Sequence, residues 1–243
     1  MGFIPPASNS FVLLIDMNRV LMDYGRAVGY RAEGVGLPTI PLRGRSLNGH
    51  IEQYKRVSRE YGRCVRKLVN RPGFFESVPA FEDALQGVRC LVNVPGVKVV
   101  LGTRLWEFSK RDALVGFRRF ISEMRRWSVK HLGDLDRPVP VAVVPDWSRF
   151  QADAFIDDRP HEACTFPPPQ YGKHIIFTQP YNSHILTSNR IDTWFTTKEQ
   201  AGAFIHGLKG GEETNILSSC ANVRHSRPYG VSLEAMCESN VED

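Results

Sequence analysis

The sequence predicts an α/β fold: a three-layer parallel sheet with helices on both faces and a small helical cap inserted after the first strand. Short apolar runs alternate along the chain with segments of helical periodicity. Several of these runs end in a polar residue, as buried parallel strands do where they reach an active site. The segment from about 22 to 76 is too long for a simple crossover, so we expect it to form the cap.

Five apolar runs are the expected strands. The first, 11–15, is continuously apolar and leads directly into Asp16. The second, 97–103, follows a Pro-Gly turn and ends in the hydroxyl of Thr103. The other three runs are 141–144, 154–156, which is closed by Asp157 and Asp158, and 174–178.

Helical periodicity fills the intervals between these strands. The expected core helices are 79–91, 110–131 and 198–208, and a further helix over 51–69 lies in the cap. A chain of 243 residues suits one core domain with a cap. The sequence therefore predicts an N-terminal extension over 1–10, a domain over 11–209, and a flexible acidic tail over 210–243.

The charge is unevenly distributed around a net value of +5. Residues 43–71 hold nine basic and two acidic residues, a balance of +7, and residues 104–130 hold eight against three, a balance of +5. The segment 211–243 has two arginines against six acids, a balance of −4. This pattern indicates either a polyanion partner or a solvated helix face.

Composition excludes several classes of protein. The five cysteines are an odd number without a Cys-x-x-Cys pair, which argues against a zinc site or a full disulfide framework and favours a reducing compartment. The longest apolar run is too short to cross a bilayer, so no membrane partner is expected. The N-terminus lacks the features of a signal peptide. An intracellular location follows, either the cytoplasm or the mitochondrion.

The strand ends carry the residues of greatest chemical interest. Asp16, Thr103, Asp157 and Asp158 should meet at one edge of the sheet, because the carboxyl ends of parallel strands lie together. Three converging carboxylates would repel one another unless a cation lay between them, and oxygen ligands favour Mg²⁺. A carboxylate beside Mg²⁺ can attack a phosphorus atom while a hydroxyl holds a phosphate oxygen.

This arrangement resembles the phosphatases of the haloacid dehalogenase (HAD) superfamily, and within it the 5'(3')-deoxyribonucleotidases. Residues 16–24, D-M-N-R-V-L-M-D-Y, are similar to the family's D-M-D-G-V-L-A-D-F. Residues 127–133, W-S-V-K-H-L-G, are similar to its W-V-E-K-Y-F-G. Residues 152–160, A-D-A-F-I-D-D-R-P, are close to its A-D-L-L-I-D-D-R-P. The resemblance extends over about 12–205 and implies a HAD-like (Rossmannoid) fold.

The resemblance also implies roles for the strand-end residues. Asp16 would be the nucleophile, and the backbone carbonyl of Asn18 would be a Mg²⁺ ligand together with Asp16. Asp158 would be a further metal ligand, supported by Asp157. The substrate class implied is a nucleoside monophosphate.

Three further residues would contact this substrate. Thr103 would bind the phosphoryl oxygens, and Tyr24 stands where the family places an aromatic side chain against the nucleotide. Positive charge could come from Arg19, Arg104 or Arg149, of which Arg104 is the candidate substrate-binding residue.

The departures from the family pattern are concentrated at the site. The family's acid–base aspartate is Asn18 here, and an amide cannot exchange a proton near pH 7. The following glycine is Arg19, and the serine after the motif threonine is Arg104. Two phosphate-contacting lysines correspond to Met124 and Trp147, and the aromatic pair of the base pocket corresponds to Asn48 and Gly49.

Two hypotheses follow. In one, the chain is a Mg²⁺-dependent phosphatase that hydrolyses (deoxy)nucleoside monophosphates. In the other, which Asn18 and the two missing lysines favour, it is a catalytically impaired or inactive pseudoenzyme retained as a binding or structural module. Its partner would then be a polyanion, such as RNA, or a multiprotein assembly. Seven basic residues recur at three- and four-residue steps and would line one side of a helix: Lys55, Arg56, Arg59, Arg63, Arg66, Lys67 and Arg71.

Overall fold

The computed structural model describes residues 10–40, 47–104, 113–144, 147, 150–159, 173–185, 187 and 189–210. The core is a six-stranded parallel sheet with the order β3-β2-β1-β4-β5-β6. The strands are β1 (Phe11–Asp16), β2 (Val97–Arg104), β3 (Val141–Val144), β4 (Ala154–Asp157), β5 (Lys173–Phe177) and β6 (Arg190–Ile191). The α/β Rossmannoid fold predicted from the sequence is therefore confirmed. The two-residue β6 was not predicted.

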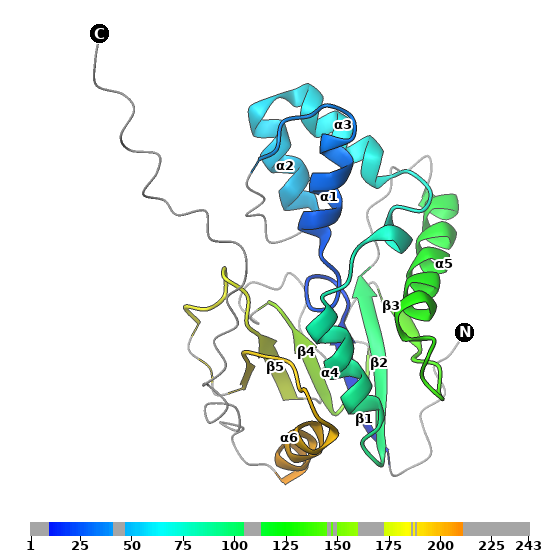
Figure 1. The fold of residues 1–243 in the computed structure, drawn as a ribbon, viewed down its shortest axis with the longest axis vertical. Helices are drawn as coiled ribbons and strands as arrows, with labels where there is room; N and C mark the ends of the chain where they lie inside the picture. The colour runs from blue at the N-terminus through cyan, green and yellow to red at the C-terminus, as the bar shows by residue number, and fades with distance from the viewer. Residues whose placement is uncertain are drawn as a thin grey trace.

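The central position of β1 determines where the site forms. β1 pairs with β2 on one side, where Asp16 lies opposite Gly102, and with β4 on the other, where Ile15 lies opposite Ile156. The last residues of all three strands therefore meet at one edge of the sheet. Figure 1 shows that this edge faces the cap, which lies beyond the carboxyl ends of the strands.

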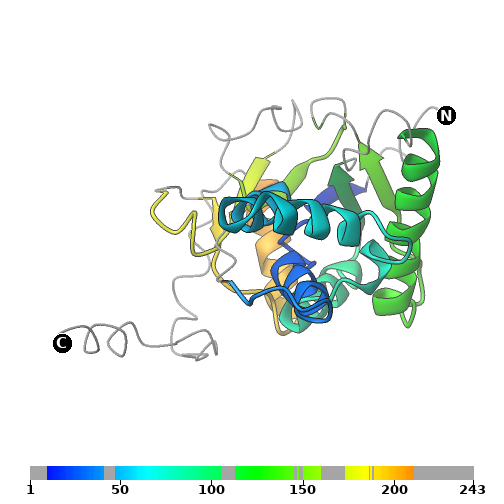
Figure 2. The ribbon, with the colours of Figure 1, turned by 90° about the horizontal axis from the view of Figure 1, so that it is seen from above.

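Three helices cover one face of the sheet: α4 (Glu82–Val92), α5 (Ala113–Leu132) and α6 (Lys198–Gly210). Alternate residues of β1, such as Leu13 and Ile15, point into the core beneath them, whereas Val12 and Leu14 point to the opposite face. In the described part of the chain, that second face is covered by Trp147 and Phe150 rather than by a helix of the kind that the strand–helix alternation predicted. Figure 2 shows the sheet edge-on beneath the cap helices.

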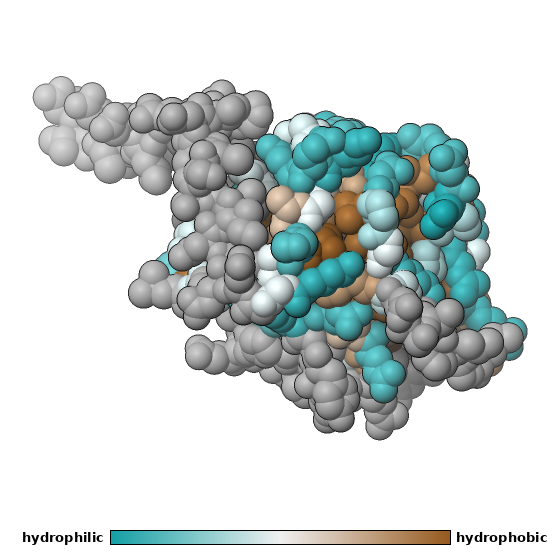
Figure 3. Space-filling view, turned by 90° about the horizontal axis from the view of Figure 1, so that it is seen from below, coloured by the Kyte–Doolittle hydropathy of each residue, from teal (hydrophilic) through white to brown (hydrophobic). Residues whose placement is uncertain are grey.

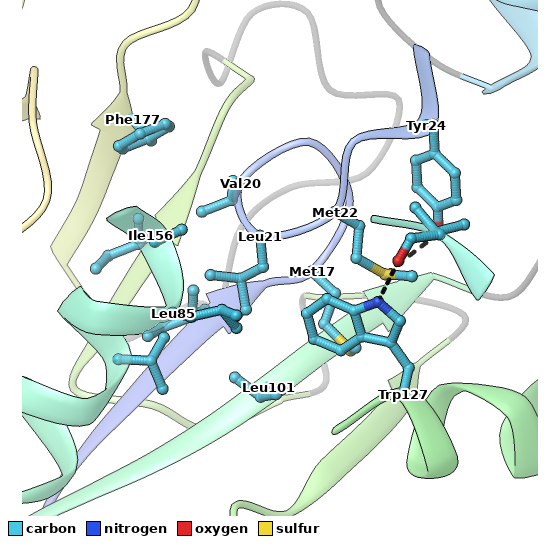
Figure 4. Packing of buried hydrophobic residues seen from close by; sticks show 14 of the residues in the cluster. Met17, Val20, Leu21, Met22, Tyr24, Leu85, Leu101, Trp127, Ile156 and Phe177 are labelled. Atoms are coloured by element: carbon cyan, nitrogen blue, oxygen red, sulfur yellow. Dashed lines mark hydrogen bonds between the residues drawn. The ribbon is translucent and has the colours of Figure 1, made fainter. Parts of the chain in front are cut away.

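The loop that follows β1 is part of the main core. Val20 and Leu21 lie among the side chains of Leu85, Leu101 and Ile156 (Figure 4). All of these side chains are buried, so the loop that carries the candidate catalytic residues is held by hydrophobic packing on both sides. At the end opposite the cap, hydrophobic residues lie in the middle of the face and hydrophilic residues surround them (Figure 3).

The cap contains α1 (Tyr24–Glu33), α2 (Leu47–Val57), α3 (Arg59–Val69) and the short 3₁₀ helix η1 (Phe75–Ser77). The chain enters and leaves it through a narrow neck, where Met22 and Ala80 form a β-bridge. α1 was not predicted from the sequence, because Gly25 and Gly29 weaken its helical pattern. The Asp23 side chain caps it by accepting a hydrogen bond from the Arg26 amide at 3.0 Å.

The prediction of one cap helix over 51–69 is wrong, because the chain breaks at Ser58. Ser58 adopts an extended backbone, φ −156° and ψ 138°, and its hydroxyl caps α3 by accepting from the Glu60 amide. α2 and α3 then pack closely, and a Cβ on Gly62 would lie 2.6 Å from that of Lys55. The seven basic residues that we expected on one side of a single helix, from Lys55 to Arg71, are therefore divided between α2, α3 and the turn that follows α3.

Two predicted segments lie mostly outside the described residues, the N-terminal extension and the acidic tail; α6 ends at Gly210. None of the helices in the described ranges combines the length and the apolar character that crossing a bilayer requires.

Glu123 joins α5 to the segment by which the chain returns from the cap. It is fully buried, and its two carboxylate oxygens accept hydrogen bonds from the amides of Gly73 at 2.8 Å and Phe75 at 3.0 Å. Arg119 lies 3.6 Å from the same carboxylate. Trp127 on the same helix adds a further buried bond, from its indole nitrogen to the Val78 carbonyl at 2.8 Å, so buried side chains of α5 attach this segment to the core.

We expect Glu123→Ala to lower the free energy of unfolding by about 3 kcal/mol, because two buried amides lose their acceptor. Glu123→Gln, which keeps one carbonyl acceptor, should cost less. Urea unfolding measures both effects, with the exposed Glu60→Ala on α3 as the control. A loss below about 1 kcal/mol for Glu123→Ala would show that the amides find other partners.

Candidate active site

Three carboxylates converge at the carboxyl edge of the sheet. Asp16 ends β1, Asp157 ends β4, and Asp158 follows directly. One oxygen from each lies within 4.8 Å of the others, and all three side chains are buried. The structure thus brings together the three aspartates that the sequence singled out.

Burial and mutual repulsion set the protonation of this cluster. Burial, reinforced by the neighbouring charge of Asp157, raises the pKa of Asp16 and of Asp158 well above the usual range of a carboxyl. Arg159 opposes this shift, with guanidinium nitrogens 3.6 Å from Asp16, 3.8 Å from Asp157 and 3.8 Å from Asp158. One arginine faces three carboxyl groups, so it can compensate the charge of only one of them.

The oxygens of this cluster fit a hard divalent cation. Among the described residues, no hydrogen bond reaches Asp16 Oδ2 or either carboxylate oxygen of Asp157. Buried carboxylate oxygens without a donor are costly unless a cation coordinates them. Mg²⁺ prefers such oxygen ligands, so the three aspartates could hold it. The particular ligand set of Asp16, Asp158 and the Asn18 carbonyl stays a prediction.

Asn18 lies at the centre of a small hydrogen-bonded group. Its backbone amide donates to Asp16 Oδ1 at 3.0 Å. Its side-chain oxygen accepts from the hydroxyl of Tyr24 at 2.9 Å and from the hydroxyl of Thr103 at 3.3 Å. Because both hydroxyls donate to the same oxygen, they fix the Asn18 carboxamide beside Asp16, the candidate nucleophile.

Tyr24 is a buried support in this structure. Only 3% of it is exposed, and its ring packs edge-on against Phe75 at 6.4 Å between centroids. Burial, followed by the charge of Asp16, raises the pKa of its hydroxyl. The hydroxyl therefore stays protonated and donates to Asn18. The role of Tyr24 as a contact of the nucleotide stays a prediction.

The two positions at which the resemblance implies lysines have become part of the core. Met124 is fully buried on α5. Trp147 packs on Gly102, where a Cβ would lie only 2.5 Å from the indole, and its ring centroid is 5.0 Å from that of Phe155. Neither position can bring a cation to the carboxylates.

The remaining candidates come from several parts of the chain. Arg104 ends β2, one residue beyond Thr103, and is half-buried. Arg19 follows Asn18 in the loop after β1, and Asn48 and Gly49 lie in the first turn of α2. Arg149 lies outside the described residues.

Sequence reasoning missed the segment that follows β5. Gln179 donates to the backbone carbonyl of Arg19, Tyr181 donates to the Asp158 carboxylate, and Asn182 donates to the Asp158 carbonyl. Arg159 was also given no role. The signal for this segment was present, since polar residues follow a predicted strand at the same edge of the sheet.

Comparison with known proteins supports the assignment made from these motifs. The sequence pattern of the family described as "5' nucleotidase, deoxy (Pyrimidine), cytosolic type C protein" matches residues 10–202. A human protein named "5'(3')-deoxyribonucleotidase, cytosolic type" is 27% identical over 194 residues, which cover 77% of this chain and 90% of the human protein.

Two bacterial structures described as haloacid dehalogenase-like hydrolases also align with the chain. The one from Xanthomonas campestris is 12% identical, covers 84% of this chain and 98% of its own, and has a TM-score of 0.39. The one from Burkholderia xenovorans LB400 is 10% identical, covers 82% and 96%, and has a TM-score of 0.38. TM-scores this low do not establish a shared fold. The fold is assigned from the order of the strands in the sheet, and the family is assigned from the sequence match. The chain belongs to the family of deoxy (pyrimidine) 5' nucleotidases of cytosolic type C.

Proposed function

We propose that this chain is a deoxyribonucleotidase-like protein that binds Mg²⁺ and a nucleoside monophosphate, and that its catalysis is impaired. The observation that carries the proposal is Asn18, a carboxamide held by Tyr24 and Thr103 where the resemblance implies an acid–base aspartate. Binding and nucleophilic attack need the carboxylates, whereas proton transfer needs the residue that has changed.

The geometry supports a nucleophilic role for Asp16. Asp16 Oδ1 accepts from the Asn18 backbone amide and Oδ2 has no hydrogen-bond donor among the described residues, so one oxygen would attack phosphorus while the other would coordinate Mg²⁺. The new bond joins Asp16 to phosphorus while the bond from phosphorus to the nucleoside oxygen breaks. A bound Mg²⁺ would stabilise charge on the phosphoryl oxygens. Thr103, at the end of the adjacent strand, would orient one of them.

Proton transfer is the step that this site lacks. The leaving nucleoside oxygen needs a proton, and the water that later hydrolyses the aspartyl phosphate must lose one. Asn18 can do neither near pH 7, and the raised pKa of Tyr24 makes its hydroxyl a poor acid. The loss of a positioned acid–base group costs about 10²–10⁴ in rate. The absence of cations at Met124 and Trp147 removes further stabilisation of the transition state.

We expect turnover of dUMP or dTMP with Mg²⁺ to lie well below the enzyme median of ~10 s⁻¹. Asn18→Asp should raise it, because Tyr24 and Thr103 would hold a carboxylate in the same place. Phosphate release from purified protein measures both rates. The control is Asn93→Asp, which adds a carboxylate at an exposed position after α4. Wild-type turnover near the median would contradict impaired catalysis.

Asp16→Asn should have opposite effects on the stability of the protein without Mg²⁺ and on its stabilisation by Mg²⁺. Without Mg²⁺, Asp16→Asn should raise the free energy of unfolding by roughly 1–2 kcal/mol, because it relieves repulsion among three buried carboxylates. The same variant should lose the stabilisation that Mg²⁺ gives the wild type. Thermal unfolding in EDTA and in Mg²⁺ measures both effects, with the exposed Asp136→Asn as the control. Equal Mg²⁺ stabilisation of Asp16→Asn and wild type would exclude this metal site.

The exposed cap surface favours a second candidate function, binding of a polyanion such as RNA. All seven basic residues from Lys55 to Arg71 are exposed on α2, α3 and the following turn. Only two of them have an acidic partner among the described ion pairs: Lys55 with Glu52 and Arg63 with Glu60. This surface has more positive charge than a nucleotide pocket needs.

RNA affinity, if this surface provides it, should fall steeply with salt. Five phosphate contacts to single-stranded RNA would lower affinity about a hundredfold between 50 and 200 mM salt, because counterions are released. Fluorescence anisotropy with single- and double-stranded RNA measures this, comparing wild type with Arg59→Ala/Arg66→Ala and with Arg137→Ala as control. No binding at low salt would exclude RNA as the partner.

A further inference from the structure

The segment 179–182 joins the two loops that carry the candidate metal ligands. Gln179 Nε2 donates to the carbonyl of Arg19 at 2.7 Å, on the loop after β1. Asn182 Nδ2 donates to the carbonyl of Asp158 at 2.6 Å, beyond β4. Gln179 and Asn182 are both buried, so the segment is fixed at both ends. Tyr181 lies between these anchors.

Tyr181 contacts both loops at once. Its hydroxyl donates to Asp158 Oδ2, and its ring lies under the guanidinium of Arg19, 4.3 Å from the centroid. The charge of Arg19 in turn interacts with the carboxylate of Asp158. Arg19, Tyr181 and Asp158 therefore form one contact group at the edge of the carboxylate cluster.

Arg19 is held in an unusual backbone conformation to make this contact. Its φ is 65°, and it is the only residue other than glycine with a positive φ in the described part of the chain. The left-handed region is unfavourable for a residue with a Cβ and persists only where surrounding contacts impose it. Here the imposing contacts include the Gln179 bond to its carbonyl and the ring of Tyr181.

We propose that Tyr181, held by Arg19, is a latch on the metal site: its hydroxyl occupies Asp158 and must withdraw before a divalent cation binds with full affinity. The proposal rests on the proposed function, since it concerns the same Mg²⁺ site. Both oxygens of Asp158 are engaged in the latched state, Oδ2 by Tyr181 and Oδ1 by Arg159 at 3.8 Å.

The competition follows from the geometry that Mg²⁺ requires. Mg²⁺ binds oxygen at 2.0–2.1 Å in a near-octahedral arrangement and tolerates little displacement of its ligands. A hydroxyl and a nearby guanidinium on Asp158 reduce the negative charge available to the cation. The opposite role is also physically possible for such a residue, because outer hydrogen bonds can orient a carboxylate and strengthen metal binding. The two roles predict opposite effects of removing the hydroxyl.

Tyr181→Phe tests the latch with the smallest change. It keeps the ring under Arg19 and removes only the hydroxyl. We expect the Mg²⁺ dissociation constant to fall by about tenfold, which corresponds to the loss of one hydrogen bond to a charged group. Isothermal titration calorimetry with Mg²⁺, and electron paramagnetic resonance with Mn²⁺, measure this without any assay of catalysis.

The cap offers a matched control in Tyr30→Phe. Tyr30 also lies under an arginine, with Arg26 5.4 Å from its ring centroid, and its hydroxyl also takes part in hydrogen bonds. It is exposed on α1 and is not part of the carboxylate cluster. Its substitution should leave Mg²⁺ affinity unchanged.

Arg19→Gly provides a second, independent variant. Glycine adopts a φ of 65° without strain, so this variant should fold while losing the guanidinium that holds Tyr181. We expect it to tighten Mg²⁺ binding as well. Unchanged or weaker binding by Tyr181→Phe would overturn the latch alone. Absence of Mg²⁺ binding by wild type and both variants would overturn the metal site of the proposed function together with it.

Discussion

The burial of three carboxylates at one end of a hydrophobic sheet is the unfavourable feature that the rest of the structure must hold in place. Charged groups without compensation are among the most unfavourable things a protein interior can contain, and Asp16, Asp157 and Asp158 have one arginine, Arg159, among them. The surrounding fold supplies the constraint that holds them. β1 is paired on both sides, its following loop is packed into the core, and the 179–182 segment is anchored at both ends. These contacts keep the backbone of the three aspartates close together at the sheet edge.

This constraint separates the parts of the site that bind from the part that transfers protons. Metal coordination depends on carboxylate oxygens and a backbone carbonyl, all of which Asn18 leaves in place. Proton exchange depends on the chemistry of one side chain, and a carboxamide lacks it. Tyr24 and Thr103 donate to the Asn18 oxygen just as they could to a carboxylate. The proposed impairment of catalysis therefore rests on one side chain that is held in the same way as a carboxylate would be.

Much of the fold and the centre of the site could be predicted from the sequence, because both depend on local patterns. Apolar runs that end in Asp16 or Asp157 indicate buried parallel strands, and the carboxyl ends of such strands lie at one edge of the sheet. The break at Ser58 was missed, because apolar periodicity continues through it and only the hydroxyl cap on α3 reveals it. The contact of Tyr181 with Asp158 could not be predicted, because it joins residues 23 positions apart through tertiary packing.

Asn18→Asp would restore a carboxylate at the acid–base position, but it would not restore the positive charge that is missing at Met124 and Trp147. Both of these side chains are buried. Trp147 fills the space above Gly102, on the strand that carries Thr103, and packs against Phe155 of β4. A lysine there would leave a cavity beside β2 and bring a charged group into an apolar cluster. Under the proposed function, positive charge for a phosphoryl group would come from the arginines near this edge, such as Arg19, Arg104 and Arg159. Arg159 and Arg19 already interact with the carboxylates, so a substrate that recruited them would compete with these contacts.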